Sequence, residues 1–187
     1  NKAAMFGLCV LALFVFLAVF ADVLVDYDRV IEQNSPDRLQ SPSAAHWFGT
    51  DGYGRDVFSR IIYGTRVSLL IGLISVAAAM LIGGVLGAVA GYYGGVIDSV
   101  IMRTLDSIMC IPPVLLALAI VASLGPGMRN LLIAITVSTV PGFTRIVRSA
   151  VLQVVGEEFI EAARACGASD ATIICRHIIP NCMGPII

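Results

Sequence analysis

The sequence predicts an all-α membrane protein, a polytopic helical bundle with about four transmembrane helices. Of its 187 residues, 58% are hydrophobic and only 13% are charged, which is roughly half the charged share that is usual in a soluble domain. The mean hydropathy is +0.90. Four long segments carry no charge: residues 3–21, 67–97, 107–128 and 130–144. This composition excludes a disordered chain, a nucleic-acid binder with a basic surface and most soluble enzymes of this size.

Residues 1–21 hold the first expected transmembrane helix. The uncharged part, residues 3–21, spans about 28 Å as a helix, close to the thickness of the bilayer core. A cleaved signal peptide is the alternative, because Lys2 precedes the run and its end, Val19-Phe20-Ala21, resembles a cleavage site. The run is long for the apolar part of a signal peptide, so we expect a transmembrane helix.

Residues 22–66 differ in composition and are expected to lie in water. They hold seven acidic residues, five arginines and two prolines. Within them, residues 49–56 read Gly-Thr-Asp-Gly-Tyr-Gly-Arg-Asp, a superficial likeness to a phosphate or calcium loop. The alternating acids of an EF-hand and the strand-to-helix context of a nucleotide fingerprint are both missing. A tight turn with local Asp–Arg pairing is therefore expected.

The second expected transmembrane helix lies within residues 67–97 and should end near Gly91, because Tyr92-Tyr93-Gly94-Gly95 combines interfacial aromatics with helix-breaking glycines. Gly83, Gly87 and Gly91 repeat at four-residue spacing. Such a stripe lets a neighbouring helix approach closely in lipid. The alternative is that glycine is simply common in membrane helices; we favour a packing stripe.

Residues 107–128 form the third run, and Pro112-Pro113 interrupts it. Prolines at membrane depth free backbone carbonyls that need protein or water partners, so this helix should face other helices or a cavity. The fourth run, residues 130–144, has 15 residues. It spans the membrane if Arg145 and Arg148 snorkel at its end, with a kink expected at Pro141.

Three charged residues, Asp98, Arg103 and Asp106, lie just before the third run. Arg103 and Asp106 are three residues apart and are expected to pair on one helix face. Charges this close to lipid are paired, or point into a bundle or an aqueous path. Structural pairing is favoured over a role in transport; a membrane-embedded enzyme using these three groups is a further alternative.

Residues 157–180 predict two short helices joined by a glycine turn. Residues 157–166 suit a helix with acids at its N-terminal end. Gly167 can adopt the left-handed turn, Ser169 can cap the second helix, and Pro180 disfavours its continuation. A DNA-binding helix-turn-helix is the alternative. Such a motif needs a basic second helix, but here that helix offers only Arg176 and His177 for contacts with phosphates and bases. A docking element for a partner protein is favoured, with no nucleic acid bound.

The sequence offers no catalytic residues and no metal site. Lys2 is the only lysine, so a G-x-x-x-x-G-K-[ST] loop is absent, and any ATP must be bound by another chain. The two histidines, His46 and His177, are expected on opposite sides of the membrane. The five cysteines show no C-x-x-C spacing and are expected as small hydrophobes rather than disulfide or zinc ligands.

Residues 156–180 resemble the EAA loop of permease subunits of ATP-binding-cassette importers, through Glu161-Ala162-Ala163, Gly167 and Ile178-Ile179-Pro180, with Ile179 where the family usually has Leu. The resemblance extends along the chain to the C-type permease of the dipeptide, oligopeptide and nickel branch. The further motifs are Gly49-Thr50-Asp51-x-x-Gly54-Arg55-Asp56-x-x-Ser59-Arg60-x-x-x-Gly64, Gly91-Tyr92-Tyr93-Gly94-Gly95, Met102-Arg103-x-x-Asp106 and Gly167-Ala168-Ser169-Asp170.

This resemblance implies a non-catalytic subunit in the plasma or inner membrane, of the type I importer class. Its partners would be a sister permease, two cytoplasmic ATPases that use ATP and Mg²⁺, and an extracytoplasmic solute-binding protein. Residues 22–66 would be extracytoplasmic, and the loop would be a cytoplasmic coupling helix. The counts of basic residues, six on each expected side, leave this orientation open. The residues implied in coupling are Glu161, Ala162, Ala163, Gly167, Ser169, Asp170 and Pro180.

Residues 67–187 would be the permease core. Family members carry two further spans after the loop, so the chain is expected to be truncated and incomplete at its C-terminus. The resemblance favours peptide import, with nickel or glutathione import of the same branch as the alternative. A membrane-anchored helix-turn-helix regulator is the alternative from another class.

Overall fold

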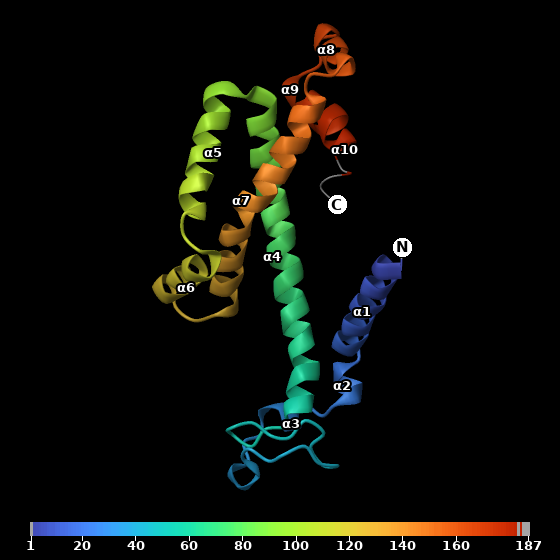
Figure 1. Ribbon diagram of the computed structural model, residues 1–187, viewed down its shortest axis with the longest axis vertical. Coiled ribbons are helices and arrows are strands. Elements are labelled where there is room, and N and C mark those ends of the chain that lie inside the picture. Colours follow the sequence, from blue (N-terminus) through green and yellow to red (C-terminus); the bar gives the residue numbers. More distant parts are fainter. Residues whose placement is uncertain (1, 183, 185–187) are drawn as a thin grey trace. The chain divides into compact units, whose positions relative to one another are not determined.

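The computed structural model describes residues 2–182 and 184, and the regular elements described there are all helical. The chain divides into two units, residues 1–73 and 74–187. The long helix α4 (Val57–Tyr93) runs from one unit into the other (Figure 1). The rest of the first unit contains three short helices after the first long one: α1 (Lys2–Val19), α2 (Ala21–Leu24), α3 (Asp28–Ile31) and the 3₁₀ helix η1 (Ser35–Asp37).

Helix α1 ends at Val19, two residues before the expected boundary. None of its side chains is buried, as suits a helix with lipid around it. The guanidinium of Arg66 on α4 donates to the carbonyls of Ala18 and Val19, the latter at 3.1 Å, and pairs with Asp22 at 2.8 Å. Because the last carbonyls of a helix lack intrahelical donors, Arg66 completes the end of α1. The hydrogen bonds from Arg66 and from the Tyr63 hydroxyl lower the pKa of Asp22.

The expected tight turn within residues 49–56 is confirmed, and Asp51 organises it. Its carboxylate accepts hydrogen bonds from the N–H groups of Tyr53 at 2.8 Å and Arg55 at 3.1 Å, and from the Arg55 side chain at 2.9 Å. Burial by itself would raise the pKa of Asp51, but these hydrogen bonds outweigh it and hold that pKa well below its usual range. The turn is therefore a structural feature built on local charge pairing.

Helix α4 begins at Val57, ten residues before the uncharged run that starts at residue 67. Asp56 explains the early start. It is 6% exposed, and its carboxylate accepts the Ser59 N–H at 2.8 Å and the Ser59 hydroxyl at 2.6 Å, as an N-cap does. His46 Nδ1 lies 3.0 Å from its other oxygen. Polar composition alone concealed this helix start.

At its other end α4 continues to Tyr93, two residues beyond the expected end at Gly91. The break comes at Gly94 and Gly95, whose φ angles of +61° and +53° lie in the left-handed region that glycine adopts without strain. Helix α4 therefore has 37 residues, or about 55 Å, well above the roughly 30 Å of a bilayer core.

The rest of the second unit is a set of helices that ends in the segment 156–180. They are α5 (Gly95–Met109), α6 (Pro113–Leu124), α7 (Met128–Val154), α8 (Glu158–Ala165), α9 (Asp170–Thr172), the π-helical segment η2 (Ile173–Ile178) and α10 (Ile179–Asn181). Among the described residues, α1, α4 and α7 are long and apolar enough to cross a membrane, and the bent pair α5–α6 makes a fourth span if it is counted as one.

The third expected run is not one straight helix. Helices α5 and α6 are bent by 85° at the break before Pro113, where the two prolines interrupt helical hydrogen bonding. Helix α6 then packs along α7 (Figure 1). The Asn130 amide donates at 2.9 Å to the carbonyls of both Leu124 and Gly125, which closes the α6–α7 connection.

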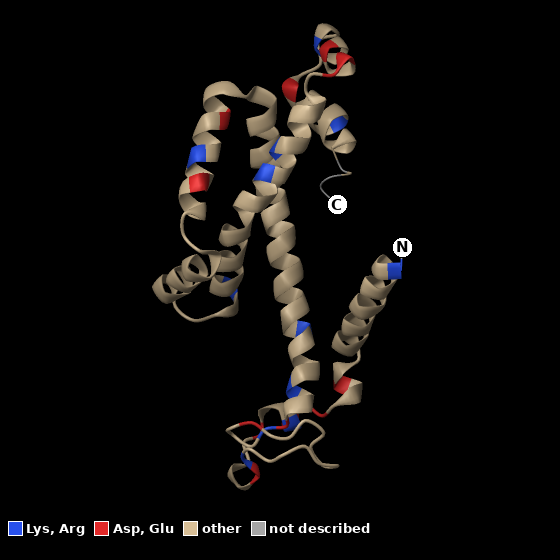
Figure 2. Cartoon of the chain, viewed as in Figure 1, with Lys and Arg blue, Asp and Glu red and all other residues tan. Residues whose placement is uncertain are grey.

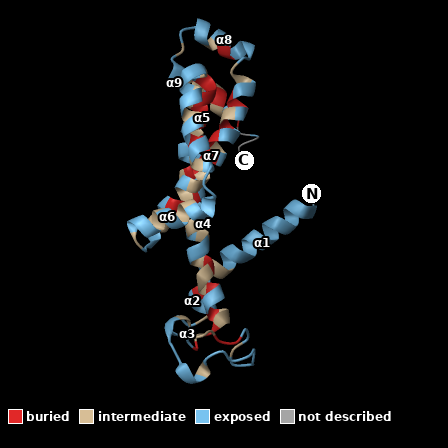
Figure 3. Cartoon of the chain, turned by 60° about the vertical axis from the view of Figure 1, so that its left-hand side comes forward, coloured by how far each residue is buried: buried red, intermediate tan, exposed pale blue. Residues whose placement is uncertain are grey.

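The fourth run is longer than its apolar stretch indicates. Helix α7 has 27 residues and continues past Arg145 and Arg148, with Pro141 inside it. Its buried residues run from Ala134 to Val151. The last three of them, Val147, Ala150 and Val151, share one hydrophobic cluster with residues of α4 and of the segment 156–180 (Figure 3). Burial, rather than the lack of charge, therefore marks the true extent of this helix.

Candidate functional site

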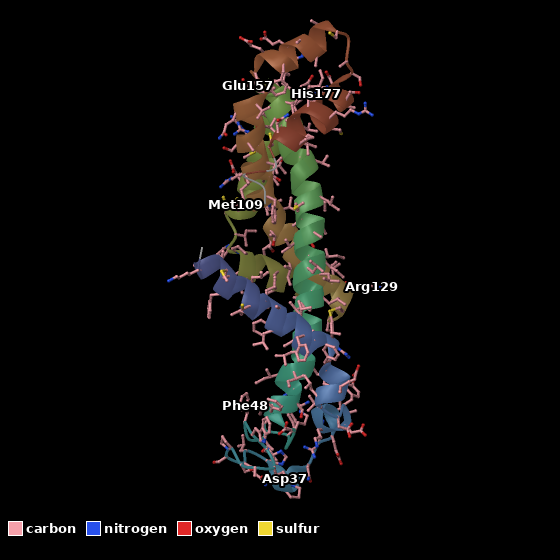
Figure 4. All side chains as sticks on the ribbon, turned by 90° about the vertical axis from the view of Figure 1, so that its right-hand side faces the viewer. Asp37, Phe48, Met109, Arg129, Glu157 and His177 are labelled. Carbon is pink, nitrogen blue, oxygen red and sulfur yellow. The ribbon has the colours of Figure 1, made fainter. Side chains whose placement is uncertain are left out.

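The candidate site is the segment 156–180, which follows α7 directly. Helix α8 ends before Gly167, whose φ of +79° gives the expected left-handed turn. Ser169 then accepts the Thr172 N–H at 3.4 Å as the N-cap of α9. Glu157, before α8, and His177, in η2, lie at the same end of the second unit (Figure 4). The predicted order of helix, glycine turn and helix is thus present.

The second helical part of the loop is less regular than expected. Residues Ile173–Ile178 are π-helical, and Pro180 lies inside α10 rather than after the helix. A proline is tolerated in the first turn of a helical segment, where its missing N–H is not required. The Asn181 amide donates to the His177 carbonyl at 2.6 Å. The helix consequently ends after Pro180, not before it.

The inner face of the loop is closely packed against the bundle. Ile160 of α8, together with Ile173 and Ile178 of η2, is 0% exposed. The three belong to one hydrophobic cluster whose other buried members are Ala88, Tyr92, Val147, Ala150, Val151 and Cys182. Each buried isoleucine contributes about 1.5–3 kcal/mol of hydrophobic free energy. The loop is therefore held firmly against the ends of α4 and α7.

The outer face of α8 is open. Glu158, Glu161 and Ala162 are exposed, and Phe159 is 42% exposed. The acidic residues are visible on α8 in Figure 2. One short helix thus presents two acids, a small residue and part of an aromatic ring, while its opposite face is fastened to the protein. Such a face is free to contact another protein.

Two tyrosines at the end of α4 attach the loop through polar contacts. The Tyr92 hydroxyl donates to one Asp170 oxygen at 2.7 Å, and the Tyr93 hydroxyl donates to the other at 3.1 Å. The Arg164 guanidinium lies 5.3 Å from the centre of the Tyr92 ring, within cation–π range. The hydrogen bonds from Tyr92 and then Tyr93 lower the pKa of Asp170. Sequence reasoning placed Asp170 in the loop but missed both tyrosines, which lie 78 and 77 residues away.

The three glycines of the stripe lie where α4 meets α7. A Cβ atom at Gly83 would lie 2.8 Å from the Cβ of Phe143, and one at Gly87 would lie 2.6 Å from the Thr144 carbonyl oxygen. At Gly91 it would lie 2.8 Å from Val151. These separations are shorter than real Cβ atoms show, so the two backbones approach closely because the side chains are missing.

The expected ion pair between Arg103 and Asp106 is wrong. Asp106 pairs instead with Arg145 of α7, and Asp98 pairs with Arg148, with 2.6 Å between Arg148 Nη2 and Asp98 Oδ2. Both contacts join α5 to α7. Helix α5 turns its apolar face, which includes Leu105, toward the other helices, and Arg103 is exposed. Arginines of a neighbouring helix compete for the aspartates, which a spacing rule within one helix does not consider.

Within the described part of the chain, no three His, Cys, Asp or Glu side chains are grouped so that they could hold a metal ion. Cys9, Cys110, Cys166 and Cys175 are exposed there, and Cys182 is buried. Burial raises the pKa of the Cys182 thiol.

These features define a class of protein: a helical membrane protein in which a helical loop follows a long span, with one face of the loop packed against the spans and the other exposed. Residues 83–187 match the model of the binding-protein-dependent transport system inner membrane component, and residues 1–42 match the N-terminal transmembrane domain of oligopeptide transport permease C. The chain belongs to the family of binding-protein-dependent transport system inner membrane components. It is a multi-pass protein of the inner, or plasma, membrane.

Curated relatives agree with this family. The chain is 49% identical to the dipeptide transport system permease protein DppC of Alkalihalophilus pseudofirmus, over 100% of this chain and 61% of that protein. It is 45% identical to the glutathione transport system permease protein GsiD of Pectobacterium atrosepticum, over 97% and 60%. Identity to DppC of Bacillus subtilis is 41%, over 100% and 58%. The chain thus spans about three fifths of the length of these relatives.

Proposed function

We propose that this chain belongs to a permease subunit that imports peptides, and that it couples ATP hydrolysis in partner chains to movement of the substrate. The observation that carries the proposal is the loop 156–180. Its inner face, with Ile160 and Ile173, is buried against α4 and α7, and its outer face, with Glu161, is exposed. A loop with one face packed on the bundle and the other exposed can transmit the movement of a bound partner to the transmembrane helices.

The proposed partners follow from the family. They are a sister permease, two cytoplasmic ATPases that bind ATP and Mg²⁺, and an extracytoplasmic solute-binding protein. Residues 156–180 then lie in the cytoplasm, with the N-terminus on the same side and residues 22–66 outside. The subunit itself is non-catalytic and binds no cofactor in this proposal. Alternating access requires that ATP and the loaded binding protein favour different conformations of the permease.

Peptides are the proposed substrate, because the relatives quoted above include two dipeptide permeases. Glutathione, itself a small peptide, is the named substrate of another relative and stays the main alternative, and nickel is a further one. The DNA-binding regulator is not favoured. Ile173 and Ile178 of the second helical part are buried against the bundle, whereas a recognition helix must be free to enter a groove.

Co-purification tests the proposal. The native-length gene product is tagged and purified in mild detergent from its own host, and the chains that elute with it are identified. We expect a second permease and ATPases with a phosphate-binding loop. The Glu161→Lys variant should recover several-fold less ATPase, because it reverses a charge on the exposed face of α8.

Glu32→Lys is the matched control, because it makes the same change at an exposed residue of the segment before α4. It should recover as much ATPase as the unchanged protein. Recovery of the permease without any ATPase, or equal recovery with Glu161→Lys, would contradict the proposed coupling function.

A further inference from the structure

Tyr92 is the residue at which α4 meets both helical parts of the loop. It is 9% exposed, and its hydrophobic cluster includes Ile160 of α8 and Ile173 of η2. Its hydroxyl donates to Asp170 of α9 at 2.7 Å, and its ring lies beneath the Arg164 guanidinium of α8. A single side chain therefore contacts α8 through a cation and α9 through a carboxylate.

The Asp170 carboxylate is held from two sides. One oxygen accepts from Tyr92, and the other accepts from Tyr93 at 3.1 Å. Hydrogen bonds to an ionised acceptor are stronger than neutral ones, and their geometry is directional. Two donors on one carboxylate restrict both its position and its orientation relative to the last turn of α4.

The loop is connected to α7 and α4 in different ways. The backbone joins it to α7 directly, through residues 155–157. It meets α4 through side chains: the apolar cluster and the polar contacts of Tyr92 and Tyr93. Hydrophobic contact is non-directional, so it resists separation but allows sliding. The hydrogen bonds to Asp170 are the contacts that can make α4 follow a sideways displacement of the loop.

We propose that Tyr92 and Asp170 are positioning residues that pass movement of the loop to α4, with Tyr93 as a second, weaker donor. This inference rests on the proposed function, in which the loop receives that movement from an ATPase. It assigns a role to the Tyr-Tyr pair that follows Gly91. A phenylalanine at position 92 would fill the same space, so the hydroxyl is not needed to pack the loop.

The test uses the native-length permease, assembled with its partners in proteoliposomes. Tyr92→Phe, Asp170→Ala and the double variant are compared by the amount of ATPase bound and by substrate imported per ATP hydrolysed. We expect bound ATPase to stay unchanged and import per ATP to fall about fivefold or more in each single variant, as loss of an energetic coupling predicts. The double variant should be no worse than Asp170→Ala alone, because that substitution already removes the contact with Tyr92.

Two further variants complete the design. Tyr53→Phe removes a hydroxyl from an exposed residue of the first unit and should leave import per ATP unchanged. Tyr92→Leu also removes the ring beneath Arg164 and should lower import per ATP further than Tyr92→Phe.

Unchanged import per ATP in Tyr92→Phe or Asp170→Ala would overturn the inference. So would effects that multiply in the double variant, or a loss of bound ATPase, which would indicate a structural role. The proposed function fails separately. In that case Glu161→Lys binds ATPase and imports substrate normally in the same assay.

Discussion

Gly84 and Gly87 lie within one turn of α4, but their surroundings differ. A Cβ at Gly87 would lie 2.6 Å from the Thr144 carbonyl oxygen and 2.9 Å from the Val147 Cβ, whereas a Cβ at Gly84 would meet nothing within 4 Å. The four-residue spacing that distinguishes Gly83, Gly87 and Gly91 from Gly84 is visible in the sequence. The sequence does not show which helix packs against these glycines, because that helix, α7, lies more than fifty residues further along the chain.

This difference predicts opposite effects of the same substitution. Gly87→Ala should destabilise the protein by about 1–3 kcal/mol, because the added methyl group forces α4 and α7 apart. Gly84→Ala should be neutral or stabilising by up to about 1 kcal/mol, because alanine favours a helix where space is open. Thermal unfolding in detergent measures both. Equal effects of the two substitutions would contradict the packing described for α4 and α7.

The ion pair between Asp98 and Arg148 carries a second prediction at the residue scale. Asp98→Ala leaves Arg148, which is 29% exposed in its side chain, without its partner. We expect a lower unfolding temperature, because an unpaired charge near lipid is costly. The exchanged variant Asp98→Arg/Arg148→Asp should recover most of the loss, since it restores an opposite-charge pair between α5 and α7. If the exchanged variant unfolded at a temperature as low as that of Asp98→Ala, the result would contradict a direct ion pair.

At the scale of the elements, the start of α4 depends on one carboxylate. Burial acts to raise the pKa of Asp56, but the hydrogen bonds from Ser59 and His46 outweigh it, so that this pKa lies below the usual value for an aspartate. The folded state therefore binds this proton less readily than the unfolded state does. Its stabilising contribution is complete above about pH 4 and is lost as the pH falls through the lowered folded pKa.

Trp47 is a natural reporter for this helix start, because its ring packs on Phe58 in the first turn of α4, with 4.9 Å between the ring centres. It is the only tryptophan among the 187 residues, and any others in the native-length chain would be replaced. We expect its fluorescence to be constant from pH 8 to pH 5 and to change below about pH 4. Asp56→Ala should show the altered emission at neutral pH and cost about 1 kcal/mol as a lost N-cap. An emission change centred near pH 6 would contradict the role of Asp56.

The elements also show how far the sequence predicts the structure. The sequence predicts the end of α1 to within two residues. The turn at Gly167 and the cap at Ser169 also follow from local chemistry. The 85° bend between α5 and α6 does not follow, because Pro112 and Pro113 predict an interruption but not its angle. Likewise, uncharged length underestimated α7, since Arg145 and Arg148 lie inside it and are paired with α5.

At the scale of the whole molecule, the spans and the family were predictable, and the contacts that organise the candidate site were not. Low charge and long apolar runs indicate a membrane protein wherever they occur. The contacts of Tyr92 with Asp170, and of Arg148 with Asp98, join residues 78 and 50 positions apart. They depend on how the helices are arranged, which composition and spacing do not specify.

In the proposed function, the exposed face of α8 binds an ATPase while the opposite face of the loop is buried. Cysteine cross-linking in the assembled native-length complex tests it most directly. One variant carries a single cysteine through Glu161→Cys, with every native cysteine of the native-length chain replaced. A second retains only Cys182, which is 1% exposed and whose thiol pKa is raised by burial, so that it reacts slowly. We predict a cross-link to the ATPase from position 161 and none from Cys182. A cross-link from Cys182, or none from position 161 in a complex that imports substrate, would contradict the account.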